Sequence, residues 1–201
     1  MDGIAWAGSA MVAARTRLEI ATQNLANVST GAFSRIAARG ELTRFGASVR
    51  RVATRERGVL RATGRDYDLA IVGDGAFAVR TAAGRTVASR DGSFSRERDG
   101  TLRDGQGRAL TAGGRVLRLP ENARIDSSGT VVTSRGVPLA RLTLPQGSSI
   151  RSGFLETSSV NAVGEMIAVL SAQRSFESAQ KVVTAIDQVR QKASGDVAAV
   201  K

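Results

Sequence analysis

The stretch NLANVSTGAFSR, residues 24–35, marks the end of the first structural element that the sequence predicts. The larger apolar residues before it repeat every seven positions: Ile4, Met11, Leu18 and Leu25. Three positions after each of them comes a smaller apolar residue: Ala7, Ala14, Ala21 and Val28. A repeat of seven favours a coiled-coil helix over the first 28 residues, although a simple amphipathic helix packed on its own domain remains open. The polar run from Asn27 to Gly31 then ends the helix.

A second helix is predicted from Asn161 toward the C-terminus. Asn161 suits an N-cap, and Glu165 places an acidic side chain in the first turn. One stripe of this helix has heptad-like spacing: Met166, Val169, Phe176 and Val183. Further apolar residues widen and extend that stripe: Val163, Ile167, Leu170, Val182, Ile186 and Val189. Apolar residues on so much of the circumference predict burial on more than one side.

Between the helices, from about Val59 to Leu144, short apolar runs alternate with Gly and Asp residues. Four Asp-Gly dipeptides favour hairpins or tight turns: Asp74-Gly75, Asp91-Gly92, Asp99-Gly100 and Asp104-Gly105. The predicted fold class is therefore α+β, with N- and C-terminal helices that pair as a coiled coil around an inserted, mostly antiparallel β domain. The predicted domains are a helical domain of residues 1–33 and 155–201, a basic connector at 34–58, and a β domain at 59–150.

The composition argues against catalysis and metal binding. The chain has 201 residues with no Cys and no His, so disulfides, thiolate or imidazole metal sites and Ser-His-Asp catalysis are excluded. The Asp-Gly repeats lack the acid spacing of a calcium loop, and GDGAF is not a complete dinucleotide-binding motif. Asp66 and Asp68 are interpreted as surface charges. We expect no enzyme activity, no catalytic residues, no cofactor and no metal.

The charge is uneven along the chain. The net charge is +11, and the segment from Arg35 to Arg65 holds nine Arg against two Glu. Such a segment could attract nucleic acid, anionic lipid or an acidic protein surface, or it could be a solvated loop. It lacks the interleaved aromatic residues that stack on bases, and no nucleic-acid-binding motif accompanies it. We expect no nucleic-acid partner, and binding by residues 35–65 is kept only as an alternative function.

Two further absences concern membranes and targeting. No apolar run approaches the length of a membrane span, so no membrane insertion is expected. The N-terminus lacks the basic region of a cleaved secretory signal peptide.

Three separated blocks resemble one known family. They are QNLANVSTGAFSR at residues 23–35, GVLRATGRDYDLAIVGDGAFAV from Gly58 with SRDGSFSRERDGTL after it, and the block that begins GFLETSSVNAVGEM at Gly153. They are similar, in order, to motifs of the bacterial flagellar basal-body rod and hook proteins, in particular the FlgF/FlgG group. The positions that carry the match are Asn24, Leu25, Ala26, Asn27, Thr30, Phe33, Asp68, Leu69, Ala70, Ile71, Gly73, Gly75, Leu155, Glu156 and Asn161.

The chain departs from the family pattern at three places. Its glycine comes one position early in the first motif, where Gly31-Ala32-Phe33 stands for x-Gly-Phe. Ala76 replaces the first of two aromatic residues, and Gly164 stands where the family has a helix former. The backbone geometry of the first motif's turn is therefore expected to differ.

The resemblance implies a structural rod subunit that assembles helically and transmits torque through the periplasm. The helical domain would form an inner tube, with the β domain outside it. The implied partners are further copies of the chain, other rod proteins, hook-side rod proteins and the flagellar type III export apparatus, through which the chain would leave without a cleaved signal. The implied subunit-interface residues are Ile4, Met11, Leu18, Leu25, Val28, Met166, Val169, Leu170, Phe176, Val183 and Ile186. The proximal rod type is favoured, and the distal rod type is the alternative.

Overall fold

The structure of the chain is a computed structural model that describes residues 3–43 and 46–198. The chain forms two compact units. The first contains the chain up to Val28, the segment Arg35–Arg55, and the chain from Val160 onward. The second contains Ser29–Ser34 and Glu56–Ser159. Each unit is therefore built from segments that lie far apart in the sequence.

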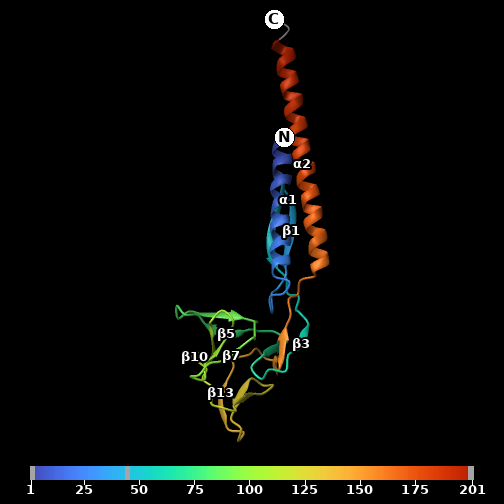
Figure 1. Ribbon diagram of the computed structural model, residues 1–201. Coiled ribbons are helices and arrows are strands. Elements are labelled where there is room, and N and C mark those ends of the chain that lie inside the picture. The colour runs from blue at the N-terminus through green and yellow to red at the C-terminus, as the bar shows by residue number, and fades with distance from the viewer. Residues whose placement is uncertain (1–2, 44–45, 199–201) are drawn as a thin grey trace. The chain divides into compact units, whose positions relative to one another are not determined.

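The first unit consists of two helices and a β-hairpin (Figure 1). Its elements are α1 (Gly3–Ala26), β1 (Ile36–Thr43), β2 (Gly46–Ala53) and α2 (Ala162–Ala198). Helix α1 packs against both α2 and the antiparallel β1–β2 hairpin. The hairpin lies within the stretch for which the sequence predicted a connector.

Two faces of α1 are buried, and each has its own residues. The heptad alanines form one face, with Ala7, Ala14 and Ala21 at 6%, 1% and 2% exposure. Ala21 lines a groove together with Ala168 and Ala172 of α2, so this face lies toward α2. At about 100° per residue, Ala13, Ile20 and Asn24 occupy a neighbouring face. That face lies toward the hairpin, because Asn24 bonds to Ile36 of β1.

The second unit is built from thirteen short strands in antiparallel pairs. They are β3 (Leu60–Ala62), β4 (Leu69–Val72), β5 (Phe77–Arg80), β6 (Thr86–Ser89), β7 (Ser95–Arg96), β8 (Leu102–Arg103), β9 (Ala109–Ala112), β10 (Arg115–Val116), β11 (Arg124–Ile125), β12 (Thr130–Val132), β13 (Pro138–Arg141), β14 (Ser149–Ser152) and β15 (Phe154–Glu156). The largest sheet has the order β6-β5-β9-β8-β7, with β10 paired to β9. Smaller sheets are β11-β12-β13, β14-β4 and β15-β3.

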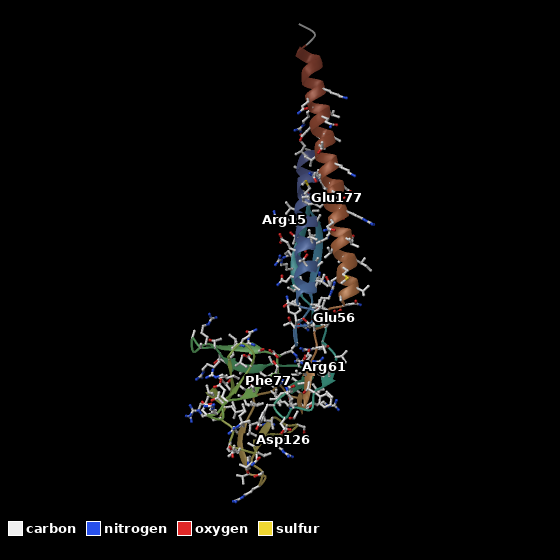
Figure 2. The ribbon with its side chains drawn as sticks, in the orientation of Figure 1. Arg15, Glu56, Arg61, Phe77, Asp126 and Glu177 are labelled. Carbon is white, nitrogen blue, oxygen red and sulfur yellow. The ribbon has the colours of Figure 1, made fainter. Side chains whose placement is uncertain are left out.

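One apolar core holds the second unit together. Leu69, Val79, Leu102, Leu110 and Val131 are all at 0% exposure. Phe77, which Figure 2 labels among these strands, meets the ring of Phe94 edge-on, with the ring centroids 5.5 Å apart. Such edge-to-face pairs add to the stabilisation that burial already provides.

The structure confirms the α+β class, the two terminal helices and the antiparallel sheets, while supercoiling of the helix pair stays a prediction. No helix among the described residues is long and apolar enough to cross a bilayer.

Candidate functional site

The end of α1 is fixed by a buried asparagine from the first sequence motif. Asn24 is at 0% exposure, and its Nδ2 donates to the Ile36 carbonyl at 2.8 Å. The Ile36 backbone N–H donates back to Asn24 Oδ1 at 2.9 Å. The side-chain amide thus gives one residue of β1 both of the hydrogen bonds that a neighbouring strand would supply. Asn24 therefore connects the helix end to the start of the hairpin.

The turn after α1 contains a residue in an unfavourable backbone conformation. Ala32 has φ +54°, in the left-handed region that favours glycine. The early position of Gly31 therefore leaves an alanine where the backbone would prefer a glycine. The Ala32 N–H donates to the Glu156 carbonyl at 2.9 Å, and the Ser159 N–H donates to the Phe33 carbonyl at 3.0 Å. The first and third motifs are thus in direct contact within the second unit.

The start of α2 is capped as the sequence predicts. Asn161 Oδ1 accepts the Gly164 N–H at 3.1 Å, which satisfies one of the free donors of the first turn. Glu165 is almost fully buried, at 3% exposure, and its carboxylate accepts a hydrogen bond from Arg35 Nε at 2.5 Å. The segment that leads into β1 is therefore joined to the first turn of α2 inside the first unit.

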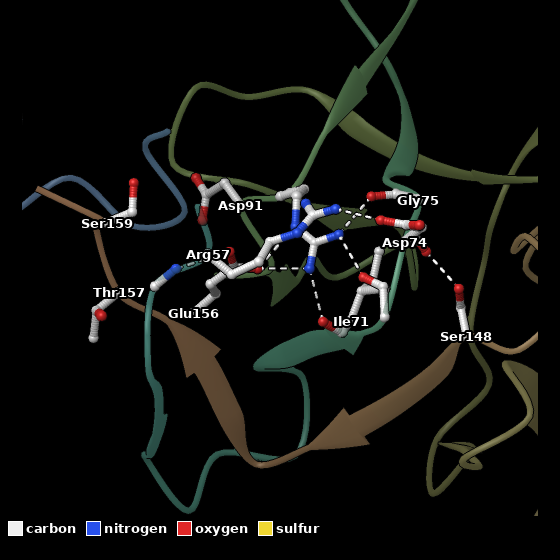
Figure 3. Close-up of polar contacts among 12 residues, drawn as sticks. Arg57, Ile71, Asp74, Gly75, Asp91, Ser148, Glu156, Thr157 and Ser159 are labelled. Carbon is white, nitrogen blue, oxygen red and sulfur yellow. Dashed lines mark hydrogen bonds and ion pairs between the residues drawn. The ribbon is translucent and has the colours of Figure 1, made fainter. Parts of the chain in front are cut away.

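A buried ion pair connects the second and third motifs (Figure 3). The side chains of Arg90 and Glu156 are 11% and 5% exposed, and Arg90 Nη2 lies 2.8 Å from Glu156 Oε2. Arg90 also donates to the carbonyls of Ile71 at 2.8 Å and Gly75 at 2.6 Å. Glu156 Oε1 accepts the Gly58 N–H at 3.3 Å. Nearly every polar atom of the pair thus has a partner, as a buried ion pair requires.

Close backbone contacts around this ion pair exclude side chains at two positions. A Cβ on Gly58 would lie 1.8 Å from the Thr157 carbonyl oxygen, and a Cβ on Gly92 would lie 1.6 Å from that of Leu69. Both distances are far below any real contact. These two glycines of the second block are therefore required by packing.

Asp68 is buried, so its interpretation as a surface charge is wrong. It is at 0% exposure and accepts two hydrogen bonds from Arg65, from Nε at 2.9 Å and from Nη2 at 2.6 Å. The hydrogen bond to Asp68, and then the charge of that carboxylate, raise the pKa of Arg65. Three residues of separation allow this bidentate contact in the turn before β4.

Two of the four Asp-Gly dipeptides, Asp99-Gly100 and Asp104-Gly105, take part in tight turns, whereas Asp74-Gly75 lies at a bend and Asp91-Gly92 lies in irregular structure. Asp99 Oδ1 accepts the Thr101 N–H at 2.9 Å, and Asp104 Oδ1 accepts the Gln106 N–H at 3.0 Å. The backbone N–H and then the hydroxyl of Thr101 lower the pKa of Asp99. In the described parts of the chain, no three His, Cys, Asp or Glu residues gather into a group that could hold a metal ion.

The remaining motif residues lie in β4 and just after it, around the end of α1, and in β15. Leu69, Ala70 and Ile71 are buried in β4, and Gly73 and Gly75 have positive φ in the turn that follows it. Leu25, Asn27 and Phe33 are half-buried, while Ala26 and Thr30 are exposed. Leu155 is half-buried in β15, opposite Arg61 of β3. Arg90 binds Glu156 and lies in the second block, but it was not among the motif positions identified from the sequence.

The expected interface residues divide into two groups. Most are half-buried in the single chain: Ile4, Met11, Leu18, Leu25, Val169, Phe176, Val183 and Ile186. Three are exposed: Val28, Met166 and Leu170. Among the α2 side chains that the structure describes, the buried apolar ones are Ala172 and Ala179, at 3% and 8% exposure. The heptad pattern thus partly describes packing inside one chain, and it leaves other apolar side chains available.

The exposed residues form a stripe at the start of α2. Val163, Met166, Ile167 and Leu170 are 67%, 53%, 62% and 56% exposed. At 3.6 residues per turn they lie roughly opposite Ala172, on the side away from α1. Exposed apolar patches on proteins often belong to interaction sites. We call these four residues the α2 stripe.

Ion pairs neutralise much of the basic segment. Arg35, Arg50, Arg51, Arg57 and Arg65 each pair with a carboxylate. Figure 3 shows one of these pairs, Arg57 with Asp74, at 2.7 Å. The local positive charge is therefore smaller than the sequence suggests.

Comparisons with known proteins agree with this arrangement. Residues 70–132 match the flagellar hook protein FlgE/F/G D1 domain, and residues 151–195 match the C-terminal region of the flagellar basal body rod FlgEFG proteins. The chain is 30% identical to the flagellar basal-body rod protein FlgF of Mesorhizobium japonicum, over 100% of the chain and 97% of the relative. It is 26% identical to FlgG of Agrobacterium fabrum, over 94% of the chain and 97% of the relative. It is 27% identical to FlgG of Bacillus subtilis, over 88% of the chain and 92% of the relative. The chain belongs to the FlgF/FlgG family of flagellar basal-body rod proteins, which are structural components of the flagellar rod.

Proposed function

We propose that the chain is a proximal-type rod subunit whose helical first unit forms the contacts between copies and transmits torque through the periplasm. The greater similarity to a FlgF protein, at 30% identity over the whole chain, supports the proximal type. A distal-type role is the second candidate, since two FlgG relatives match at 26% and 27%. Nucleic-acid binding by residues 35–65 has no support from the comparisons.

The observation that carries the proposal is the two-sided burial pattern of α2. One side of the helix packs on α1 through small residues such as Ala172. The other side exposes the α2 stripe, and the half-buried residues between them keep apolar surface accessible. Each large apolar side chain that a neighbouring copy covers completely contributes about 1.5–3 kcal/mol. A helical assembly repeats that contribution at every subunit.

In this proposal α1 and α2 pair as a coiled coil, and that pair lies in the inner layer of the rod. The chain leaves the cell through the flagellar type III export apparatus without a cleaved signal peptide. It then contacts further copies of itself, other rod proteins and hook-side rod proteins. The proposal also places the basic connector, residues 34–58, against acidic grooves on neighbouring subunits. Charge reversal at Arg50, Arg51 and Arg55 is expected to impair assembly, and normal motility of that variant would contradict this part.

The experiment that tests the function is electron microscopy of basal bodies from a strain that lacks the gene. Arrest before the hook, with rings and an incomplete rod, is the expected result. The length of the remaining rod separates a proximal position from a distal one. Complete hook-basal bodies in the deletion strain would contradict a required rod role.

Complementation then tests the α2 stripe itself. Ile167→Glu is expected to leave the chain folded, because the side chain is 62% exposed, but to abolish rod completion. Gln180→Glu is the matched control, because Gln180 is exposed on the same helix away from the stripe. Equal motility of the two complemented strains would show that the α2 stripe has no role in assembly.

A further inference from the structure

The hairpin of the first unit has an open edge along β1. In an antiparallel pair, every second residue directs its backbone N–H and C=O away from the partner strand. Ile36 is such a residue, because both of its backbone groups bind Asn24 instead of β2. Ala38 and Gly40 follow at alternate positions of the same strand and have the same orientation. Within the described residues, their outward backbone groups have no hydrogen-bond partner, so this edge is a template for pairing with another strand.

A groove lies between β1 and α2, beside α1. Its volume is about 270 Å³. Ile36 and Ala38 line it from β1, and the lining residues of α2 run from Glu165 to Ser175. The helix from Glu165 to Ser175 is about 15 Å long, and the strand from Ile36 to Gly40 is about 13 Å long. The groove therefore has the length of a short extended segment.

The charge of the groove favours an acidic occupant. Arg35 is already paired with Glu165, so the charges of these two lining residues cancel. Arg17 of α1 also lines the groove, its side chain is exposed, and it has no carboxylate partner among the described residues. A Cβ on Gly40 would lie 3.1 Å from Arg17 Nη2, so this guanidinium lies close to the open edge of β1. A carboxylate on an added strand would meet an unpaired positive charge there.

We propose that this groove binds an extended acidic segment of a partner protein, which adds a third strand to the hairpin along β1. Main-chain hydrogen bonds to Ala38 and Gly40 supply the contact that any added strand makes. A carboxylate that meets Arg17 supplies the selection between partners. The hairpin of a second copy is a poorer occupant, because its β2 strand contains two arginines and no carboxylate and would leave Arg17 unpaired. The site is separate from the α2 stripe, and the inference goes beyond the proposed rod function.

The test is binding of a labelled peptide to the full chain, measured by fluorescence anisotropy. The probe is a short blocked peptide in which valine alternates with threonine, with one glutamate near its centre. Ala38→Pro removes an outward N–H and keeps the ladder with β2, because proline is tolerated where the N–H of an edge strand points outward. Ala53→Pro is the matched control, because Ala53 has the same orientation on the opposite edge of the hairpin. Arg17→Glu and a second peptide with lysine in place of glutamate test the charge.

We expect saturable binding that Ala38→Pro and Arg17→Glu each weaken about tenfold or more, while Ala53→Pro changes it less than about twofold. Hydrogen exchange at the Ala38 and Gly40 amides of the wild-type chain should become slower when the peptide is added. This measurement tests the contact even if Ala38→Pro prevents folding.

Four results would overturn the inference: no saturable binding, unchanged exchange at both amides, equal binding of the lysine peptide, or equal weakening by Ala53→Pro. Slower exchange at these amides when the concentration of the chain alone is raised would also overturn it, because a second copy would then occupy the edge. None of these results bears on the proposed rod function, which the deletion strain tests separately.

Discussion

Replacement of Asn24 is expected to separate the end of α1 from the start of the hairpin. The side chain is at 0% exposure and makes hydrogen bonds of 2.8 and 2.9 Å to the two backbone groups of Ile36. Asn24→Ala removes both bonds. An unsatisfied buried polar group costs about 1–3 kcal/mol, and Ile36 is only half-buried, so water restores part of the loss. We expect a decrease in the free energy of unfolding of about 2–4 kcal/mol.

Asn24→Asp gives a sharper test, because it keeps the shape and one acceptor. The ionised carboxylate still accepts the Ile36 N–H, but it also faces the Ile36 carbonyl without a proton to donate. Burial and that carbonyl favour the protonated form, so the pKa of the introduced carboxyl is raised in the folded state. The stability of this variant relative to wild type is therefore greatest below the unfolded pKa of about 3.9 and falls as pH rises.

The assay is urea unfolding of the full chain followed by far-UV circular dichroism, with hydrogen exchange at the Ile36 amide as the local measurement. Asn27→Ala is the control, because its Nδ2 donates to the exposed Gln23 carbonyl at 2.8 Å in the same motif, and it should cost less than about 1 kcal/mol. A loss below about 0.5 kcal/mol for Asn24→Ala, with unchanged exchange at Ile36, would refute the reasoning.

Three further predictions concern the second unit. Ala32→Gly should raise the free energy of unfolding by about 0.5–1 kcal/mol, because glycine adopts the backbone angle φ of +54° without steric strain. A lower free energy of unfolding than wild type in urea denaturation would contradict this. Glu156→Ala should lower the free energy of unfolding, measured by heat or urea, by about 3–5 kcal/mol, because the Arg90 charge stays buried without its partner. Arg57→Ala removes an exposed ion pair and should lower the free energy of unfolding by less than about 1 kcal/mol. Because the pKa of Asp99 is lowered on folding, its contribution to stability is present above an unfolded pKa of about 3.9 and is lost as pH falls through the folded value. Asp99→Asn should therefore weaken the dependence of stability on pH in acid, and an unchanged acid profile would argue against the Thr101 contacts.

Local sequence patterns were sufficient for the two helices and for the presence of short strands between them. The seven-residue repeat predicts α1, Asn161 and Glu165 predict the start of α2, and the Asp-Gly dipeptides predict turns between short strands. Each of these signals depends on residues within a few positions of one another, and propensity and turn chemistry act over that range. The hairpin β1–β2 was missed because the excess of Arg from position 35 to 65 indicated a solvated connector, and because its strands do not alternate buried and exposed residues along their length.

Sequence also located most of the motif residues without revealing what they do. The three blocks place Asn24, Asp68 and Glu156 in the family pattern, but nothing near them in the sequence indicates that all three are buried. The interface residues were predicted as one class, although the structure divides them between packing inside the chain and exposed surface. A heptad gives the apolar face of a helix, and it does not say which partner covers that face.

The sequence by itself determined the fold class, the two terminal helices and the family. Only the tertiary structure decided that Arg90 binds Glu156, 66 positions away, that Asn24 bonds to Ile36, 12 positions away, and that α2 has a stripe facing away from α1. The physical reason is that secondary structure follows from interactions between near neighbours in the chain. Burial and hydrogen-bond partners depend instead on which distant segments the folded backbone brings together.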